Sequence, residues 1–281
     1  MMEAILTNDA LTVADDADGI RTITLDLKGS VMNTLGAALT MPLEAALRAA
    51  MADDAVKGIV LTSAKDSFVA GGDLKQLGAG YDLSDKSMAE KVEMFAYLST
   101  LLRWMETAGK PVACAINGLA LGGGLEIAMA CHYRVVADDP RIMLGLPESQ
   151  VGLMPGGGGT QRLPRLIGLA KALPMILKGS SIGPAEALKA GLVHAVTPKD
   201  ALVDTAKAWL REHGDPVQPW DKKGFKIPGG AGTLDANFRN TFMGASAMTR
   251  AIGFGNYPAP ERILATLYEG LQLPMDKALK V

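Results

Sequence analysis

The stretch PVACAINGLALGGGLEIAMACHYRVVADD, residues 111–139, decides how the rest of the chain is interpreted. It opens with an apolar run typical of a buried strand and then passes three consecutive glycines. From Leu125 to Cys131 its apolar residues have helical spacing. A strand, a tight turn and a helix in immediate succession indicate one strand–helix unit of an α/β fold.

Glu126 is the single acidic or basic side chain between Pro111 and Cys131. A carboxylate among apolar residues is costly when it is charged and unpaired, so burial is expected to raise its pKa toward neutral pH. The glycines Gly122, Gly123 and Gly124 leave backbone N–H groups unoccupied at a helix start, where the helix dipole favours negative charge. One turn therefore combines an anion-binding backbone with a buried carboxyl group, which suggests an enzyme site.

Two other interpretations of this stretch stay open on these residues alone. The stretch is long enough to span a membrane, although Asn117, Glu126 and the glycine cluster argue against a continuous helix. Alternatively, Glu126 is a structural carboxylate that caps a backbone group. The structural and the catalytic interpretation of Glu126 are about equally supported here.

The composition of the whole chain indicates a globular protein with a sizeable core. The chain has 281 residues, of which 48% are hydrophobic and 21% charged, and a net charge of −2 gives no general attraction to nucleic acid or membranes. The first residues lack the order of a secretory signal, so we expect a cytoplasmic protein. Cys114 and Cys131 read as buried reduced thiols, and the three histidines are too scattered to suggest a metal site.

Strand patterns alternate with helix patterns over the first two hundred residues. We expect strands at 20–27, 56–61, 111–116 and 133–137 and helices at 35–51, 86–107 and 125–131. A further helix is expected at 184–190, where a proline begins the pattern and Gly191 follows it. This alternation predicts an α/β fold without choosing between a doubly wound sheet and a spiral of strand–helix units.

The composition changes near His213 to a stretch rich in proline and glycine, and helix patterns follow at 234–252 and 259–271. We therefore expect a catalytic core at 1–200 and a helical C-terminal region at 201–281.

A second informative stretch is LPESQVGLMPGGGGTQRLPRLIG, residues 146–168. Pro147 fixes the backbone directly before Glu148, which suits a side chain that must be aimed. The four glycines Gly156–Gly159 match neither a P-loop nor a dinucleotide fingerprint, so we expect a tight turn with close backbone packing.

Glu126 and Glu148 are thus two carboxyl groups on different elements, and Gly71-Gly72 forms another glycine turn before a possible helix start. Paired carboxyls and two backbone N–H donors suit a reaction that moves a proton beside a carbonyl and stabilises an enolate. Spacing does not prove that these groups meet in space.

Several of these motifs resemble the enoyl-CoA hydratase/isomerase (crotonase) family. SFVAGGDLKQL (67–77) is similar to its first oxyanion-hole motif, INGLALGGGLEIAMACHYRVVA (116–137) to the second, and residues 146–168 to the signature that follows. KGSVMNTLGAAL (28–39) resembles its N-terminal substrate loop. The resemblance covers roughly residues 15–210 with the motifs in the family's order.

The resemblance implies a crotonase-like spiral of repeated ββα units with a C-terminal helical appendage, assembled as trimers or pairs of trimers. It implies that the amides of Gly72 and Gly123 form an oxyanion hole for a thioester oxygen. It also implies that Glu126 orients and activates a water molecule, while Glu148 supplies a proton to the α-carbon of a trans-2-enoyl-CoA.

The same resemblance assigns substrate binding to the neighbouring positions Ala70, Gly71, Asp73 and Gly122. Many relatives carry alanine in place of Gly72, which should matter little because the backbone does the binding. Coenzyme A is then part of the substrate, and no separate cofactor or metal is expected. The presence of both glutamates favours a hydratase; the alternatives are a 3,2-enoyl-CoA isomerase and a catalytically silent acyl-CoA-binding or assembly module.

The C-terminal part carries a narrower resemblance. PWDKKGFKIPGG (219–230) and YPAPERILATLYEGLQLPMDKAL (257–279) are similar to the hydratase part of multifunctional fatty-acid β-oxidation proteins, which continue into an NAD-dependent 3-hydroxyacyl-CoA dehydrogenase. This sequence lacks a Rossmann fingerprint, so we expect a fragment of such a protein. The partners expected are an acyl-CoA substrate, further copies in a homo-trimer, or a fused or associated dehydrogenase and thiolase, without nucleic acid or a membrane span.

Overall fold

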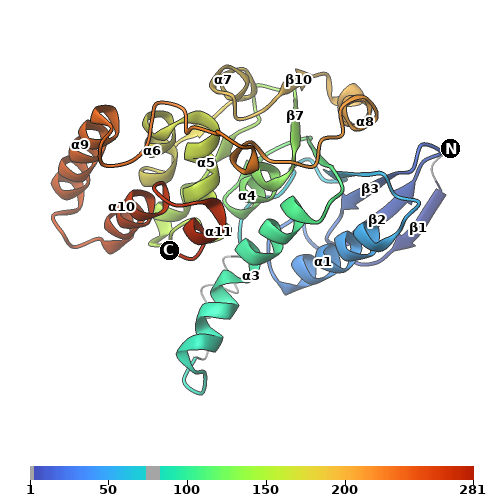
Figure 1. The fold of residues 1–281 in the computed structure, drawn as a ribbon. Coiled ribbons are helices and arrows are strands. Elements are labelled where there is room, and N and C mark those ends of the chain that lie inside the picture. The colour runs from blue at the N-terminus through green and yellow to red at the C-terminus, as the bar shows by residue number, and fades with distance from the viewer. Residues whose placement is uncertain (1–2, 74–82) are drawn as a thin grey trace.

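A computed structural model describes residues 3–73 and 83–281 (Figure 1). Within these residues a seven-stranded sheet has the order β1-β2-β3-β4-β5-β7-β10. Its strands are β1 (Glu3–Thr7), β2 (Leu11–Asp15), β3 (Ile20–Leu25), β4 (Gly58–Ser63), β5 (Val112–Ile116), β7 (Tyr133–Ala137) and β10 (Ala195–Thr197). The pairs β1–β2 and β2–β3 are antiparallel, and all later pairs in this sheet are parallel.

A second, smaller sheet is built from three short strands in the order β6-β8-β9. They are β6 (Ala120–Leu121), β8 (Leu144–Gly145) and β9 (Ser181–Ile182). The chain runs from β5 in the large sheet to β6 in the small sheet and then into helix α4 (Gly123–Ala130). It repeats this path from β7 through β8 and the 3₁₀ turn η1 (Pro147–Val151) to helix α5 (Gly159–Ile167). These are successive ββα units, and their helices α4 and α5 pack against each other.

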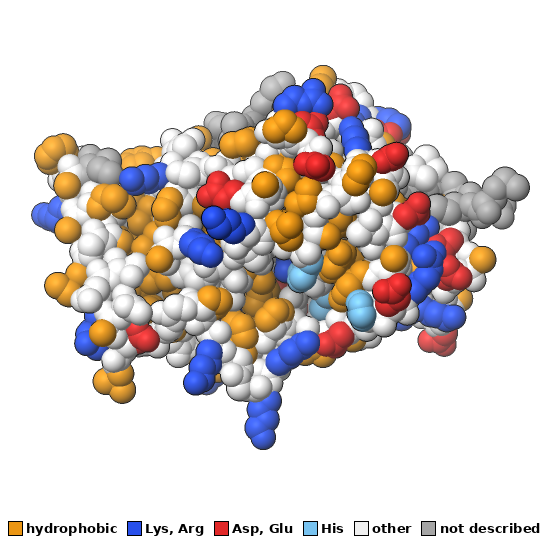
Figure 2. Space-filling view, turned by 90° about the horizontal axis from the view of Figure 1, so that it is seen from above, with side chains coloured by type: hydrophobic (Ala, Val, Ile, Leu, Met, Phe, Trp, Pro, Cys, Tyr) orange, Lys and Arg blue, Asp and Glu red, His pale blue; other side chains and the backbone are white. Residues whose placement is uncertain are grey.

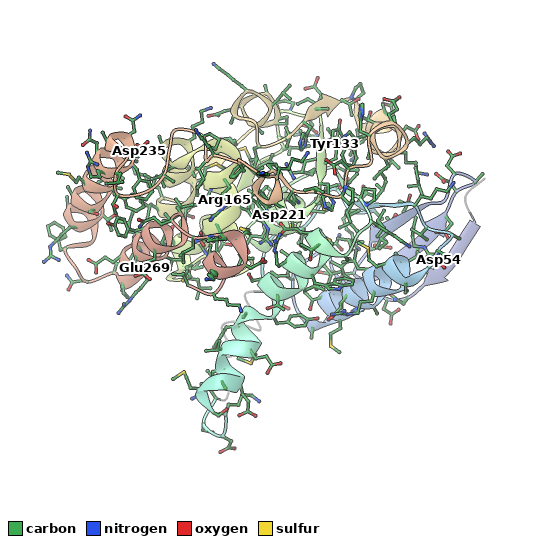
Figure 3. All side chains as sticks on the ribbon, in the orientation of Figure 1. Asp54, Tyr133, Arg165, Asp221, Asp235 and Glu269 are labelled. Carbon is green, nitrogen blue, oxygen red and sulfur yellow. The ribbon has the colours of Figure 1, made fainter. Side chains whose placement is uncertain are left out.

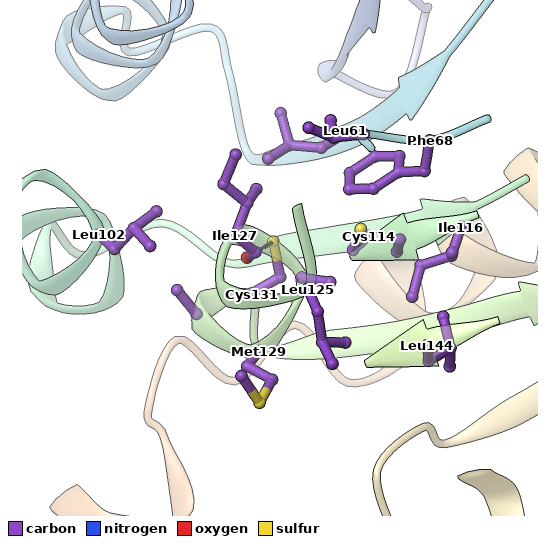
Figure 4. Packing of buried hydrophobic residues seen from close by; sticks show 14 of the residues in the cluster. Leu61, Phe68, Leu102, Cys114, Ile116, Leu125, Ile127, Met129, Cys131 and Leu144 are labelled. Atoms are coloured by element: carbon purple, nitrogen blue, oxygen red, sulfur yellow. Dashed lines mark hydrogen bonds between the residues drawn. The ribbon is translucent and has the colours of Figure 1, made fainter. Parts of the chain in front are cut away.

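The central strands are apolar because both of their faces are covered. Every residue of β4 and β5 is buried, as is usual for parallel strands with helices on either side. Leu61, Phe68 and Ile127 pack together beside Cys114 in this core, each without exposed surface (Figure 4). Both cysteines are free and buried, as predicted. This packing fixes the position of α4.

Further helices pack on the large sheet or against α4 and α5. They are α1 (Ala37–Ala52), α3 (Met88–Thr107), α6 (Leu169–Leu177), α7 (Pro184–Ala190) and α8 (Leu202–Glu212). The α3 helix begins after Ser87, which forms a reciprocal capping box with Glu90. Its first half projects away from the rest of the structure (Figure 1).

The C-terminal helices α9 (Ala236–Gly253), α10 (Pro258–Gly270) and α11 (Met275–Ala278) lie at the side of α5 and α6. Phe238, Phe242 and Tyr268 pack their rings together between α9 and α10. The predicted division at residue 200 stays a prediction; α8, just beyond it, contacts β4, β5 and β7 of the large sheet.

The surface seen from above carries acidic and basic side chains interspersed with apolar ones (Figure 2). None of the helices in the described part of the chain is long and apolar enough to cross a membrane.

The predicted elements at 20–137 are present with ends shifted by a few residues. The sequence interpretation missed β1, β2, α6, α11 and the three short strands of the second sheet. The shift at α4 matters, because the helix begins at Gly123 rather than at Leu125. Two of the glycines are therefore its first residues. The end of the first oxyanion-hole motif, 74–77, lies outside the described residues.

Candidate active site

The two predicted glycine turns meet in space. Gly71 has a φ of +92° and Gly122 a φ of +53°, a region that glycine enters without strain. A Cβ atom built on Gly122 would lie 3.6 Å from the Cα of Gly71. The turn before α4 and the turn after Phe68 are therefore neighbours, although they are far apart in the sequence.

Leu35 connects the amides expected to act as donors. It forms an isolated bridge with Gly72, in which its N–H donates to Gly71 O at 2.8 Å and its O accepts from Asp73 N–H at 2.9 Å. In this parallel bridge the hydrogen bonds to Leu35 are made by Gly71 and Asp73, the residues on either side of Gly72. The N–H of Gly72 therefore points away from Leu35. Gly123 is the first residue of α4, so its N–H has no acceptor one turn earlier. A Cβ on Gly123 would lie 2.3 Å from Leu35 Cδ1, so Gly123 lies against the side chain of the residue whose backbone pairs with Gly72.

The other predicted substrate positions surround the same turns. Ala70 donates its N–H to Asn33 O at 2.9 Å, and Gly122 donates its N–H to Gly145 O at 2.9 Å. Asp73 and Ala70 are half-buried and Gly71 is buried. The fold thus brings Ala70, Gly71, Asp73 and Gly122 together; a role in substrate binding stays a prediction.

Glu148 faces the Gly122 turn from the element η1. A Cβ on Gly122 would lie 2.9 Å from Glu148 Oε1, so glycine at this position leaves room for the carboxyl group. The other oxygen, Oε2, is buried and has no hydrogen-bond partner among the described residues. Burial, and secondly the charge of Glu126, raise the pKa of Glu148 to about 8. This carboxyl is therefore a candidate acid that keeps its proton at neutral pH.

Glu126 lies in the first turn of α4 and is 2% exposed. Its Oε1 accepts the N–H of Gly159 at 2.7 Å, and a Cβ on Gly157 would lie 2.7 Å from its Oε2. Gly159 is the first residue of α5, so the carboxylate sits at a helix N-terminus. Burial raises the pKa of Glu126, while the amides of Gly159 and Gly157 and the charge of Arg162 act in the opposite direction.

The Gly156–Gly159 turn does more than the sequence interpretation assigned to it. It packs closely, as expected, with Gly158 at a φ of +95°, but its amides also hold Glu126. Four glycines before a helix start were visible as an anion-binding signal. The sequence did not reveal which carboxylate would face them.

A C-terminal contact was also missed. The hydroxyl of Tyr257, just before α10, donates a hydrogen bond to the carbonyl oxygen of Ser149, the residue after Glu148. No sequence pattern links these positions.

A mostly apolar cavity of about 830 Å³ adjoins the site between α1 and α3. Gly72 and Leu35 lie at the site, and Met94, Phe95 and Leu98 line the α3 side. This volume is within the range of small-molecule sites. In the described residues no group of three or more His, Cys, Asp or Glu side chains is arranged to hold a metal ion.

Taken together, the site has two carboxyl groups with raised pKa values beside an apolar cavity. Within the part of the chain that the structure describes, the amides of Gly72 and Gly123 have no backbone acceptor. Such groups can pass protons to and from a bound molecule while amides stabilise a developing oxyanion.

Comparisons with known proteins identify related sequences and structures. Residues 15–216 match the family model described as Enoyl-CoA hydratase/isomerase. The fatty acid oxidation complex subunit alpha of Shewanella frigidimarina is 39% identical over 277 residues, and that of Shewanella amazonensis is 41% identical over 270 residues. Each alignment covers 94% of this chain and 36% of the relative, so the chain spans about a third of the length of these curated relatives.

Solved structures give the same fold. The chain superposes on an enoyl-CoA hydratase from Bacillus anthracis with a TM-score of 0.63 and 26% identity, covering 96% of this chain and 87% of that one. An enoyl-CoA hydratase from Polaromonas sp. JS666 gives a TM-score of 0.63 and 26% identity, with coverages of 72% and 76%. The expected spiral of ββα units with a C-terminal helical appendage is confirmed.

Proposed function

This chain belongs to the enoyl-CoA hydratase/isomerase family, and on that premise we propose that it adds water to trans-2-enoyl-CoA thioesters. One observation carries the proposal: Glu126 and Glu148 come from different elements, yet Glu148 faces the Gly122 turn at the start of the helix that carries Glu126, and the charge of Glu126 helps to raise the pKa of Glu148. A hydratase needs such a pair, since one group must activate water and another must deliver a proton.

The oxyanion part of the reaction is assigned to the amides of Gly72 and Gly123. They donate to the thioester oxygen, which draws electrons from the conjugated double bond and makes its β-carbon electrophilic. Each such donor is typically worth ~3 kcal/mol to the transition state.

The proton transfers are assigned to the two carboxyl groups. Glu126, ionised and held by the amide of Gly159, accepts a proton from the water molecule as the water oxygen bonds to the β-carbon. The electrons of the double bond move to the thioester oxygen. Glu148, which keeps its proton at neutral pH, then protonates the α-carbon. Glu126 then carries the proton from water and Glu148 has lost its own, so a proton passes from Glu126 to Glu148, directly or through solvent, before the next turnover. The net reaction consumes one water molecule and forms the 3-hydroxyacyl thioester, with no resident cofactor required and coenzyme A remaining part of the substrate.

The wider setting follows from the relatives' names. We infer that the chain works as the hydratase part of a multifunctional β-oxidation protein, because relatives named fatty acid oxidation complex subunit alpha align with 94% of it. A fused or associated dehydrogenase, an associated thiolase, a cytoplasmic location and a possible homo-trimer belong to the same proposal.

The test is hydration of crotonyl-CoA, followed as the loss of the absorbance of its conjugated thioester. We expect saturable hydration by the wild-type chain and a fall in kcat of ~10²–10⁴-fold in both E126Q and E148Q. E186Q, which changes an exposed glutamate on α7, is the matched control and should retain wild-type turnover.

The alternatives give different results in the same experiment. Conversion of a 3-enoyl-CoA without hydration of crotonyl-CoA would identify an isomerase. Tight binding of acyl-CoA without turnover would identify a binding module. Near-wild-type hydration by E126Q or E148Q would contradict the assigned roles.

A further inference from the structure

Arg162 on α5 is a buried cation that contacts the glycine turn holding Glu126. Its Nε donates to Glu106 Oε1 at 2.6 Å, and both side chains have 0% exposure. Its Nη1 donates to the carbonyl oxygen of Gly157, also at 2.6 Å. Burying an arginine is costly unless its hydrogen bonds are made, so a location directly behind this turn calls for an explanation.

The carbonyl group that Arg162 holds lies between the two amides that face Glu126. Those amides belong to Gly157 and Gly159. A Cβ on Gly158 would lie 2.2 Å from Arg162 Nη1, so the guanidinium packs directly against the turn. Fixing one peptide plane of so short a turn limits the rotation of its neighbours, and glycines alone would leave that rotation free.

We propose that Arg162 is a positioning residue for hydration: through the Gly157–Gly159 turn it holds Glu126 in place and favours its ionised form, while Glu106 holds Arg162. The inference rests on the proposed function, in which Glu126 is the base. Arg162 acts on the reaction through this turn and its charge.

The charges around Glu126 come from three elements. Glu148 on η1 faces the same site, and Arg162 is on α5. Glu106 on α3 lies behind Arg162, and its second oxygen accepts from Arg103 Nη1 at 3.1 Å. Because Glu106 is shared by two arginines, it anchors Arg162 without cancelling the positive charge on this side of Glu126.

Arg165 offers a matched control one turn further along α5. It is also buried, and its Nη2 donates to Gly270 O at 3.1 Å and Leu273 O at 2.9 Å, next to the C-terminal helices (Figure 3). Its Nη1 donates to Gln161, and among the described residues it has no hydrogen bond with the Gly157–Gly159 turn, so its loss should affect stability and leave Glu126 in place.

The experiment measures kcat, KM and the pH profile of kcat/KM for R162Q, R162K and R165Q, with thermal melts of each. We expect R162Q to lower kcat ~10²-fold, the usual cost of a small misplacement, with little change in KM. In R162Q the ionised Glu126 loses a nearby positive charge and well-aligned amides, so its pKa should rise. The acidic limb of the pH profile, where kcat/KM falls as Glu126 becomes protonated, should therefore move to higher pH. R162K keeps the charge, so it should leave the limb in place and restore part of kcat.

R165Q should have a lower melting temperature than the wild type, while the acidic limb of its pH profile stays at the wild-type pH. If R162Q behaves in this same way, with only its melting temperature altered, Arg162 is merely structural and the proposal is wrong. Wild-type kcat in R162K would likewise overturn the positioning role.

A readout without turnover separates this inference from the proposed function. Carboxyl ¹³C NMR of glutamate-labelled protein, with the Glu126 signal assigned by its loss in E126Q, follows the titration of that group directly. The midpoint should rise in R162Q and stay in R165Q. A wild-type chain that fails to hydrate crotonyl-CoA refutes the function, while an unshifted midpoint in R162Q refutes the role of Arg162.

Discussion

At the scale of single residues, Glu148 combines burial with a like charge nearby. Burial is the larger cause of its pKa of about 8, and the charge of Glu126 is the second. A carboxyl group in this state donates a proton at neutral pH, which an exposed glutamate cannot do efficiently.

A pH profile tests this assignment. If Glu148 must be protonated to act as the acid, kcat/KM should fall above about pH 8, since this quantity reports the free enzyme. A profile that stays flat well above that value would contradict the role of Glu148 as the acid.

The same pKa affects stability. The folded-state pKa of Glu148 is raised from 4.5 to about 8, so the folded state binds its proton more tightly than the unfolded state. Its contribution to stability is therefore full below the unfolded pKa and is lost as pH rises toward about 8, with a slope of at most ~1.4 kcal/mol per pH unit.

E148Q removes this titration. The wild type loses the contribution of Glu148 as pH rises, whereas E148Q has none to lose. The free energy of unfolding of E148Q minus that of the wild type should therefore increase from mildly acidic to alkaline pH. Urea unfolding at several pH values measures the difference. A constant difference across that range would show that the Glu148 pKa is not raised.

At the scale of elements, the turn before α5 consists of glycines because the Glu126 carboxyl group and the Arg162 guanidinium occupy the space that side chains of Gly157, Gly158 and Gly159 would need. A Cβ on Gly157 would also lie 3.0 Å from Leu98 Cδ2. At Gly156, by contrast, the nearest atom is Met154 O at 4.0 Å.

This difference makes a matched pair of variants. G157A should lower kcat by ~10²-fold, because the new methyl group displaces Glu126, and overpacking of this kind typically costs ~1–3 kcal/mol of stability. G156A should keep near-wild-type activity, because its methyl group meets open space. Equal loss in both variants would indicate a general need for flexibility in the turn instead of a specific contact.

The sequence predicted elements where periodicity was strong and failed where it was short or interrupted. The α7 helix was predicted at its observed bounds, Pro184–Ala190, because a proline begins it and a glycine follows it. The α6 helix was missed, since only Gly168 separates it from α5 and Pro174 lies inside it. Their separation depends on packing, which local patterns do not contain.

The residues of the site also fall into those that local sequence patterns identified and those that depend on packing. Glu126 was identifiable because it is the one charged group in an apolar stretch, and Glu148 because a proline precedes it. That the charge of Glu126 would act on Glu148 required either the fold or the family resemblance to predict. The Arg162–Glu106 pair could not be predicted, because its partners come from helices far apart in sequence and any of many charges could have paired.

At the scale of the whole molecule, Arg103 on α3 connects the core to the C-terminal region. Its guanidinium donates to both oxygens of Asp221 at 2.8 Å and to Asp276 Oδ1 at 2.6 Å, besides Glu106. Asp221, labelled in Figure 3, ends the 3₁₀ turn Pro219–Asp221 before α9, and Asp276 is on α11, which is labelled in Figure 1. The hydrogen bond from Arg103 is also the main cause of the lowered pKa of Asp276. One side chain therefore joins segments from both sides of the predicted boundary.

R103Q should destabilise the whole protein by ~1.5–3 kcal/mol, the range for hydrogen bonds to charged groups. The loss should be less than the full cost of an orphaned buried charge, because Glu106 keeps Arg162 as a partner. Arg141, whose side chain is 89% exposed and pairs with Asp139, is the matched control, and R141Q should change stability by under ~1 kcal/mol. Urea unfolding is followed by two signals, one that reports on the core and one that reports on residues 201–281. If residues 201–281 and the core unfold as one unit, R103Q should move a single common unfolding transition to a lower urea concentration. If the two regions are energetically independent, R103Q should leave the unfolding transition of the core unchanged, which would contradict the role of Arg103.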